Sequence, residues 1–193
     1  MNKQIKKIIE DSINTKKQIL NDNSIMDKIQ LSVSEVVKSL SNKGTLYLAG
    51  NGGSAADSQH IAAEFVVRFH KNRQAFPAMA LTTDTSILTA IGNDFGFDEL
   101  YTRQLQAHAS NNDIFMAIST SGNSNNIIQA LEYCKKKNIT SIGLTGQSGG
   151  KMDNLCDICI KIPSDNTARI QESHILVGHI ICLLVEQELT KIS

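Results

Sequence analysis

The chain has 193 residues, 41% hydrophobic and 20% charged, and its 19 basic and 19 acidic side chains leave no net charge. This composition is typical of a globular protein and excludes a disordered or fibrous chain, and the length predicts a single domain over residues 1–193. With balanced charge and no sustained run of basic residues, the chain lacks the positive surface typical of nucleic-acid binders, so we expect no nucleic-acid partner. Neither a membrane span of roughly 20 apolar residues nor a secretory signal is recognised, so we expect no membrane partner and a cytoplasmic location.

Residues 1–42 contain no glycine or proline, and their apolar residues recur at intervals of three and four. This periodicity predicts a helical segment of two amphipathic helices, with a break near "NDNS" where Asn23 or Ser24 caps the second helix. Their apolar stripes need a surface to pack on, and in so small a chain that surface is expected on another subunit.

From Gly44 onward, short β-rich runs alternate with helical ones. This alternation predicts an α/β fold, a flavodoxin-like doubly wound sheet of five parallel strands, preceded by the N-terminal helices. Ligands bind such sheets at the carboxyl ends of the strands, so the loops that follow the strands are the ones to search. The predicted strands are 45–50, 78–82, 113–119, 140–145 and 158–163, and the predicted helices are 53–70, 85–109 with a break at "NDFGFD", 123–137 and 167–190.

Two of these loops, "GNGGSAADS" and "STSGNSNN", place glycines and hydroxyls between a strand and a helix. Backbone N–H groups, serine hydroxyls and the helix dipole together favour an anion there, which predicts a phosphate site. The first loop also contains the dinucleotide pattern GxGxxA, but the acidic residue expected about 20 positions later is missing, and neither loop ends as a Walker A motif does. A capped turn in which Asn123 or Ser124 only starts the next helix is the plain alternative for the second loop.

The four cysteines are expected to be reduced. Cys156 and Cys159 have CxxC spacing but lie in "LCDICIKI", whose alternation predicts a strand with the two thiols on opposite faces. Buried structural thiols are therefore favoured over a redox or zinc pair, which needs a turn between the cysteines.

His60 and Glu64 are four residues apart and share one face of the predicted helix that follows the first cradle loop. At this spacing a histidine and a carboxylate chelate one metal, act as an acid–base pair, or form a surface ion pair. The apolar residues around them predict a packed helix, which favours a buried site.

The last predicted helix is densely apolar and carries four polar exceptions, Gln171, Glu172, His174 and His179. The two histidines are about 140° apart around a helix, so they cannot chelate one metal together. Only one of them is expected to face the site.

The cradle loops resemble those of the sugar isomerase (SIS) domain family, which holds phosphosugars on loops rich in serine and threonine. From Leu46 to the end the chain is similar to the phosphoheptose isomerases within that family. The shared motifs are "AGNGGSAADSQHIAAEF", "GNDFGF", "ISTSGNS", "LTGQSGGKM" and "ARIQESHILVGHIICLLVE".

The resemblance implies one zinc ion per subunit, with His60, Glu64, Gln171 and His179 as ligands. Gln171 and His179 are about 12 Å apart along a helix, so the metal would lie between chains or Gln171 would be a long, tilted ligand. A homotetramer with sites at subunit boundaries is also implied.

The implied reaction converts sedoheptulose 7-phosphate to D-glycero-D-manno-heptose 7-phosphate through an enediol, the first step of nucleotide-activated heptose biosynthesis. Glu64 would shuttle the proton between two carbons. His179 would exchange a proton with a substrate oxygen or act as the partner acid or base. The expected substrate-binding residues, besides Gln171, are Asn51, Gly52, Gly53, Ser54, Asn93, Asp94, Ser119, Thr120, Ser121 and Ser124. The alternatives are a non-catalytic SIS-domain regulator, which binds a phosphosugar or the replication initiator protein, and an isomerase of shorter sugars.

Overall fold

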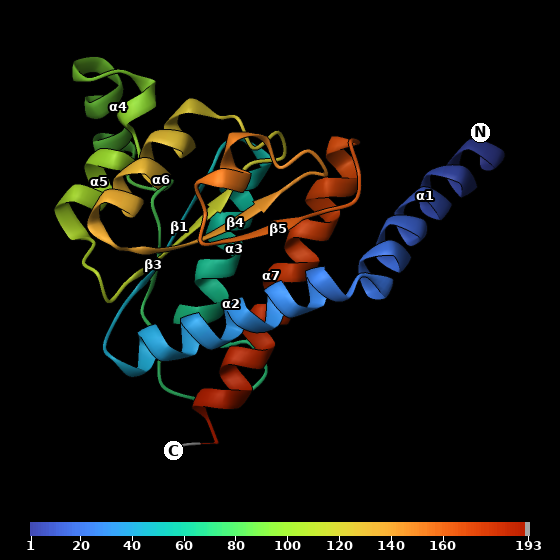
Figure 1. Ribbon diagram of the computed structural model, residues 1–193, viewed down its shortest axis with the longest axis horizontal. Helices are drawn as coiled ribbons and strands as arrows, with labels where there is room; N and C mark the ends of the chain where they lie inside the picture. Colours follow the sequence, from blue (N-terminus) through green and yellow to red (C-terminus); the bar gives the residue numbers. More distant parts are fainter. Residues whose placement is uncertain (192–193) are drawn as a thin grey trace.

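The structure, a computed structural model, describes residues 1–191 and contains one five-stranded sheet in which all neighbouring strands are parallel (Figure 1). The strand order is β2-β1-β3-β4-β5, the flavodoxin-like order, so the predicted fold class is confirmed. The strands are β1 (Leu46–Gly50), β2 (Ala78–Ala80), β3 (Ile114–Ile118), β4 (Thr140–Thr145) and β5 (Ile158–Lys161). The single domain over 1–193 stays a prediction, and its last two residues lie outside the described range.

Helices cover both faces of the sheet (Figure 1). Because side chains alternate along a strand, Met116 of β3 enters one apolar core and its neighbour Phe115 enters the other. The first core is closed by α2 (Asn23–Ser41), α3 (Gly53–Val66) and α7 (Thr167–Leu189). The second is closed by α4 (Thr85–Asp94), α5 (Thr102–His108) and α6 (Asn125–Lys137), with short 3₁₀ turns η1 (Phe97–Glu99) and η2 (Gly150–Asn154) nearby.

The two N-terminal helices, α1 (Asn2–Asn21) and α2, are separated at the predicted break. The cap is Asp22 rather than Asn23 or Ser24, which corrects the sequence-based assignment. Its Oδ1 accepts hydrogen bonds from the N–H groups of Ser24 at 2.9 Å and Ile25 at 3.3 Å. All the polar residues of "NDNS" are capping types, so propensity alone did not identify the one that turns the chain.

Helix α1 projects from the body of the protein (Figure 1), and near its end Ile19 joins the first core, whereas the apolar residues of its first part do not. Ser12 Oγ donates to Glu172 Oε2 at 2.7 Å, and Arg169 Nη1 donates to the carbonyl of Ile8 at 3.2 Å, which ties the helix to the start of α7. The stripe itself is about half exposed, at Ile5 49%, Ile8 48%, Ile9 53% and Ile13 46%.

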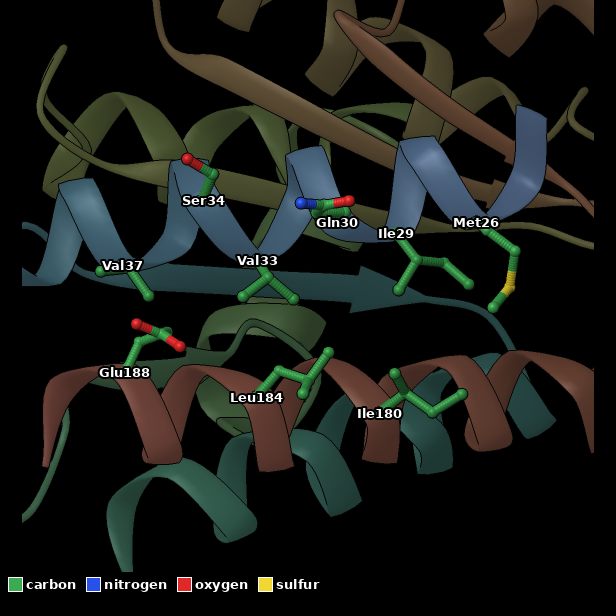
Figure 2. A pocket seen from close by; sticks show the side chains of 9 residues that line it. All are labelled: Met26, Ile29, Gln30, Val33, Ser34, Val37, Ile180, Leu184 and Glu188. Carbon is green, nitrogen blue, oxygen red and sulfur yellow. The ribbon is translucent and has the colours of Figure 1, made fainter. Parts of the chain in front are cut away.

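Helices α2 and α7 pack side by side but leave an open groove of about 600 Å³ between them. Figure 2 shows Val33 of α2 and Leu184 of α7 pointing toward each other across it. The groove is mostly apolar along its length and ends at Glu188. Met26 and Leu184 are exposed apolar residues of this groove, at 44% and 36%, whereas Ile29 and Val33 are buried.

Helix α7 is the one helix within residues 1–191 that is long and apolar enough to cross a membrane, with a mean hydropathy of 1.3 in its most apolar window. By that measure the expectation that no stretch approaches a span is wrong. Core helices pass the same test, and 44% of this window is buried, against α2, α3 and the sheet. The apolar character of α7 therefore has a sufficient explanation in the core.

The predicted thiol arrangement is wrong. Strand β5 begins at Ile158, so Cys156 precedes it, and the Cys156 Sγ atom lies 2.6 Å from where a Cβ on Gly143 would be. Gly143 is the register partner of Cys159, which brings both thiols to one face of the sheet. A hydrogen bond between them raises the pKa of Cys156 and lowers that of Cys159. Cys159 is buried as expected, whereas Cys156 is only partly so.

His174 lies on α7 with no exposed surface, and neither ring nitrogen makes a well-formed hydrogen bond to the part of the chain that the structure describes. Burial lowers its pKa to about 4, and the neighbouring backbone of Thr145 offsets only part of that effect. The unfolded chain takes up this proton near pH 6.5 and the folded chain only near 4. The stability that neutral His174 contributes is therefore fully present above about pH 6.5 and is lost progressively as the pH falls toward 4.

We expect the His174 contribution to the free energy of unfolding to drop by about 3 kcal/mol over that range. Denaturant titrations at pH 7 and pH 4.5 measure the loss, with the His174→Gln variant as the comparison, because its side chain has no proton to take up. An equal pH dependence in both proteins would contradict this assignment.

Candidate active site

The two cradle loops lie side by side because β1 and β3 are neighbours in the sheet. Gly50 pairs with Ile118 at the carboxyl ends of these strands, and the loops begin at the next residues. Ser119 and Ser124 bring their Oγ atoms within 3.0 Å. Ser124 is the N-cap of α6 but makes no side-chain capping bond, so its hydroxyl is not used to start the helix. This observation favours a ligand-binding loop over a capped turn.

Glycine is required in both loops. Gly52 has φ +56° and ψ −120°, a conformation closed to other residues, and it forms the N-cap of α3. Gly122 has φ +65°, and a Cβ there would lie 2.1 Å from the carbonyl oxygen of Gly149. The second loop therefore depends on close backbone contact with the segment after β4.

We expect Gly122→Ala to raise the KM for a phosphosugar at least about tenfold and to lower stability by about 1–3 kcal/mol, because the added methyl group displaces the loop. Steady-state kinetics and thermal unfolding measure the two effects. Gly92→Ala is the matched control, since it adds the same methyl group within α4 with no atom within 4 Å. Equal kinetics in the two variants would exclude the loop from phosphate binding.

A polar network joins the two loops. Asn51 and Asn126 exchange side-chain hydrogen bonds, each at 2.9 Å, and Tyr101 donates to the carbonyl of Gly50 and to Asn51 Oδ1 at 3.2 Å. Burial raises the pKa of Tyr101 to about 12, so it stays a donor. Asn51 thus uses most of its side chain on its neighbours. Asn126 and Tyr101 were not expected in the site, because nothing in the local sequence sets them apart.

The other expected substrate contacts are placed as follows. Ser54 is buried in the first turn of α3, and Thr120 is half-buried, with its carbonyl bonded to the N–H of Gly146. The Ser121 hydroxyl accepts the N–H of Asn123 inside the loop. Asn93 and Asp94 hydrogen-bond to each other at 2.8 Å at the end of α4, and no hydrogen bond within residues 1–191 links them to the cradle.

Gln171 lies near the first loop. Its Nε2 atom is 2.5 Å from the position of a Cβ on Gly53, so glycine there makes room for it. Further along, a Cβ on Gly178 would meet the Ile61 side chain at 2.6 Å. These two contacts show that α3 and α7 run in the same direction. Within one chain Gln171 therefore lies at the cradle end of α3, about two turns before His60.

His60, Glu64 and His179 form a cluster whose possible ligand atoms all lie within 4.8 Å of one another. His60 Nε2 is 3.1 Å from Glu64 Oε1 and 3.3 Å from His179 Nε2. The second carboxylate oxygen, Oε2, makes no hydrogen bond within residues 1–191. The cluster thus joins the middle of α3 to the middle of α7, as the choice of His179 over His174 requires.

The cluster is not buried within the chain, contrary to expectation. The His60 side chain is 49% exposed and that of Glu64 24%. The buried face of α3 consists instead of residues such as Ile61 and Phe65. The site residues therefore lie on the rim between the two helices.

The donor set fits a divalent metal ion. Two donors that each lie about 2.0–2.1 Å from a tetrahedral zinc are about 3.3 Å apart, which is the separation of the two imidazole nitrogens. Burial, followed by the neighbouring His60, lowers the pKa of His179, which keeps it in the neutral form that binds metal. Asp57, one turn before His60, has a half-buried carboxylate whose Oδ2 has no hydrogen-bond partner among residues 1–191, and burial raises its pKa.

Comparison with known proteins shows the family to which this chain belongs. The SIS domain pattern matches residues 9–146. A phosphoheptose isomerase of Aneurinibacillus thermoaerophilus is 58% identical over 187 residues, covering 97% of this chain and 94% of that protein. The chain belongs to the phosphoheptose isomerases of the SIS domain family. Phosphoheptose isomerase 2 of Campylobacter jejuni is likewise 58% identical, over 98% of this chain and 94% of that protein.

Solved phosphoheptose isomerases have the same fold. The protein from Francisella tularensis superposes with a TM-score of 0.92 at 36% identity, covering 96% of this chain and 97% of that one. The protein from Neisseria gonorrhoeae gives a TM-score of 0.90 at 37% identity, covering 96% and 98%. The predicted family and enzyme class are thus confirmed.

Proposed function

We propose that this isomerase interconverts sedoheptulose 7-phosphate and D-glycero-D-manno-heptose 7-phosphate. The supporting observation is that one helix, α3, begins at the phosphate cradle and carries two residues of the metal-type cluster further along. From Ser54 to His60 the helix rises about 9 Å. A sugar that is phosphorylated at one end and isomerised at the other needs two such sites, separated by the length of its carbon chain.

The cradle binds the phosphate through Ser54, Ser119, Thr120, Ser121 and Ser124. Glycine backbone N–H groups and the starts of α3 and α6 add positive potential. The sugar hydroxyls are bound by Gly52, Gly53 and the second side-chain N–H of Asn51, which does not bond to Asn126. Further contacts come from Asn93, Asp94 and Gln171. The phosphate thereby fixes the distance of the carbonyl end from Glu64.

Glu64 is the proposed base. Aldose–ketose isomerisation moves one proton between adjacent carbons through an enediol, and a carboxylate that takes and returns this proton serves both halves. Oε1 faces His60, whereas Oε2 makes no hydrogen bond to any described residue and can accept the proton. His179 is the proposed group that exchanges a proton with the substrate oxygen.

The metal is proposed to be zinc, held by His60, Glu64 and His179, with Gln171 of another chain as a fourth ligand. When bound, such an ion stabilises negative charge that develops on the substrate oxygens. The protein's own residues position the sugar and move the proton. The non-catalytic regulator is disfavoured, because the Glu and His that such proteins lack are present here and adjacent.

The test of this function is turnover of ketose phosphates with five, six and seven carbons, with and without a metal chelator. We expect preference for the seven-carbon substrate and loss of turnover on chelation. Equal turnover of all three would contradict the proposed spacing, and no turnover of any by the zinc-loaded protein would contradict the reaction.

A homotetramer with sites at subunit boundaries is part of the proposal. The exposed α1 stripe and the α2–α7 groove leave apolar area that a second copy would cover. The half-exposed metal cluster would be enclosed where a site lies at a subunit boundary. A cytoplasmic location belongs to the proposal as well, since phosphorylated sugars are charged and do not cross membranes freely.

Light scattering of the intact protein is expected to give four times the 21.1 kDa chain mass. Ile9→Glu, which places a charge on the α1 stripe, is expected to reduce the assembly to smaller species. Lys3→Glu on the same helix serves as the control for a charge change alone. A monomer in the unmodified protein would contradict the tetramer.

A further inference from the structure

Glu186, near the end of α7, is a buried carboxylate at 1% exposure. Its Oε1 accepts from the N–H of Phe69 at 3.1 Å, and its Oε2 accepts from those of His70 and Lys71, both at 2.9 Å. Burial by itself raises the pKa of Glu186, but these donors and Arg73 together hold it below its usual range. Glu186 is therefore an ionised group that holds the segment after α3.

Arg73 completes this arrangement from the same segment. Its side chain is 5% exposed, and Nε donates to Glu186 Oε1 at 2.9 Å. Nη2 donates to the carbonyl of Glu64 and Nη1 to that of Phe65, both at 2.9 Å. Arg73 thus satisfies the carbonyl of Glu64 and shares that of Phe65 with the N–H of Phe76, both in the last turn of α3.

Both groups lie on the side of the metal cluster opposite the cradle. Arg73 holds the backbone of Glu64 directly. Glu186 holds Phe69, whose ring centroid is 5.5 Å from that of His179. One buried ion pair therefore fixes a ligand-bearing turn of α3 and the aromatic wall beside the ligand on α7.

We propose that Glu186 and Arg73 are positioning residues for the active site, which set the placement of Glu64 relative to His179. The inference rests on the metal site proposed above. Neither residue touches the cluster with its own charged group, so both act through the backbone of Glu64 and the ring of Phe69. Mutation of residues that orient metal ligands from outside typically lowers metal affinity or activity by 10- to 100-fold.

The first measurement is zinc affinity of Glu186→Gln, by competition with a chromophoric chelator. The amide keeps the size of the side chain but loses the charge and one acceptor. We expect zinc to bind about 10- to 100-fold more weakly, and kcat at a fixed zinc level to fall with KM for the phosphosugar nearly unchanged, because the cradle is at the other end of α3. Glu132→Gln, at an exposed position of α6, is the control and should match the unmodified protein.

The second variant separates positioning from stability. A buried charge without its partner destabilises a protein strongly, whereas removing both charges is far milder. The double variant Glu186→Gln, Arg73→Met is therefore expected to regain most of the thermal stability lost in Glu186→Gln while zinc affinity and kcat stay low. Zinc affinity and kcat equal to those of the unmodified protein would overturn the proposal. Failure of the unmodified protein itself to bind zinc would refute the metal site and, with it, this inference.

Discussion

Glu64→Gln is expected to lower kcat by at least about 100-fold, and up to about 10⁴-fold, while the phosphosugar still binds. Glutamine keeps the shape of the side chain but cannot accept the proton that moves between the two carbons. The phosphate cradle lies at the other end of α3, about 15 Å away along the helix from Ser54 to Glu64, and is not altered.

The measurement combines product formation at saturating zinc with calorimetric titration of sedoheptulose 7-phosphate. The zinc content of the variant is determined alongside, because Glu64 is also a proposed ligand. Glu132→Gln controls for the loss of a carboxylate elsewhere. Full turnover by the zinc-loaded Glu64→Gln protein would remove Glu64 from the mechanism.

Removal of the metal is expected to have an effect of similar size. Stabilisation of a developing oxyanion by a metal ion supplies several kcal/mol, so the metal-free protein should be slower by about 10²- to 10⁴-fold. Added zinc should restore the unmodified protein. His179→Asn, which shortens one ligand, should need more zinc for recovery and stay below full activity.

The informative comparison is with His108→Asn, which alters a histidine on α5 outside the cluster and should behave like the unmodified protein. Turnover that is insensitive to chelation, or a His179→Asn protein that responds to zinc as the unmodified one does, would contradict the assigned ligands.

The fold and the centre of the site were accessible from sequence because their signals are local. Short β-rich runs alternating with helical periods dictate a parallel sheet, and a glycine-rich turn between strand and helix marks the ligand end of it. The i, i+4 spacing of His60 and Glu64 places both on one side of a helix, and the angle between His174 and His179 limits the site to one of them.

Features that depend on distant contacts were not accessible. The sequence predicts that the helix after β1 reaches residue 70, but α3 ends at Val66. Arg73 and Phe76 donate hydrogen bonds to the carbonyls of its last turn. Glu186 is an acid in an apolar run, which local pattern alone does not pair with a loop about 115 residues earlier. The half-exposed state of His60 was missed for a related reason. The apolar residues beside it in the sequence pack into the core, and they do not indicate how exposed the opposite face of α3 is.

We propose that His60 and Glu64 on α3 meet His179 on α7 at one zinc ion. Anomalous X-ray scattering at the zinc edge, from crystals of the zinc-loaded protein, locates the ion. We predict one strong peak per chain, between the Nε2 atoms of His60 and His179 and within coordinating distance of a Glu64 oxygen. A chain without that peak, or with its zinc bound elsewhere, would contradict the account.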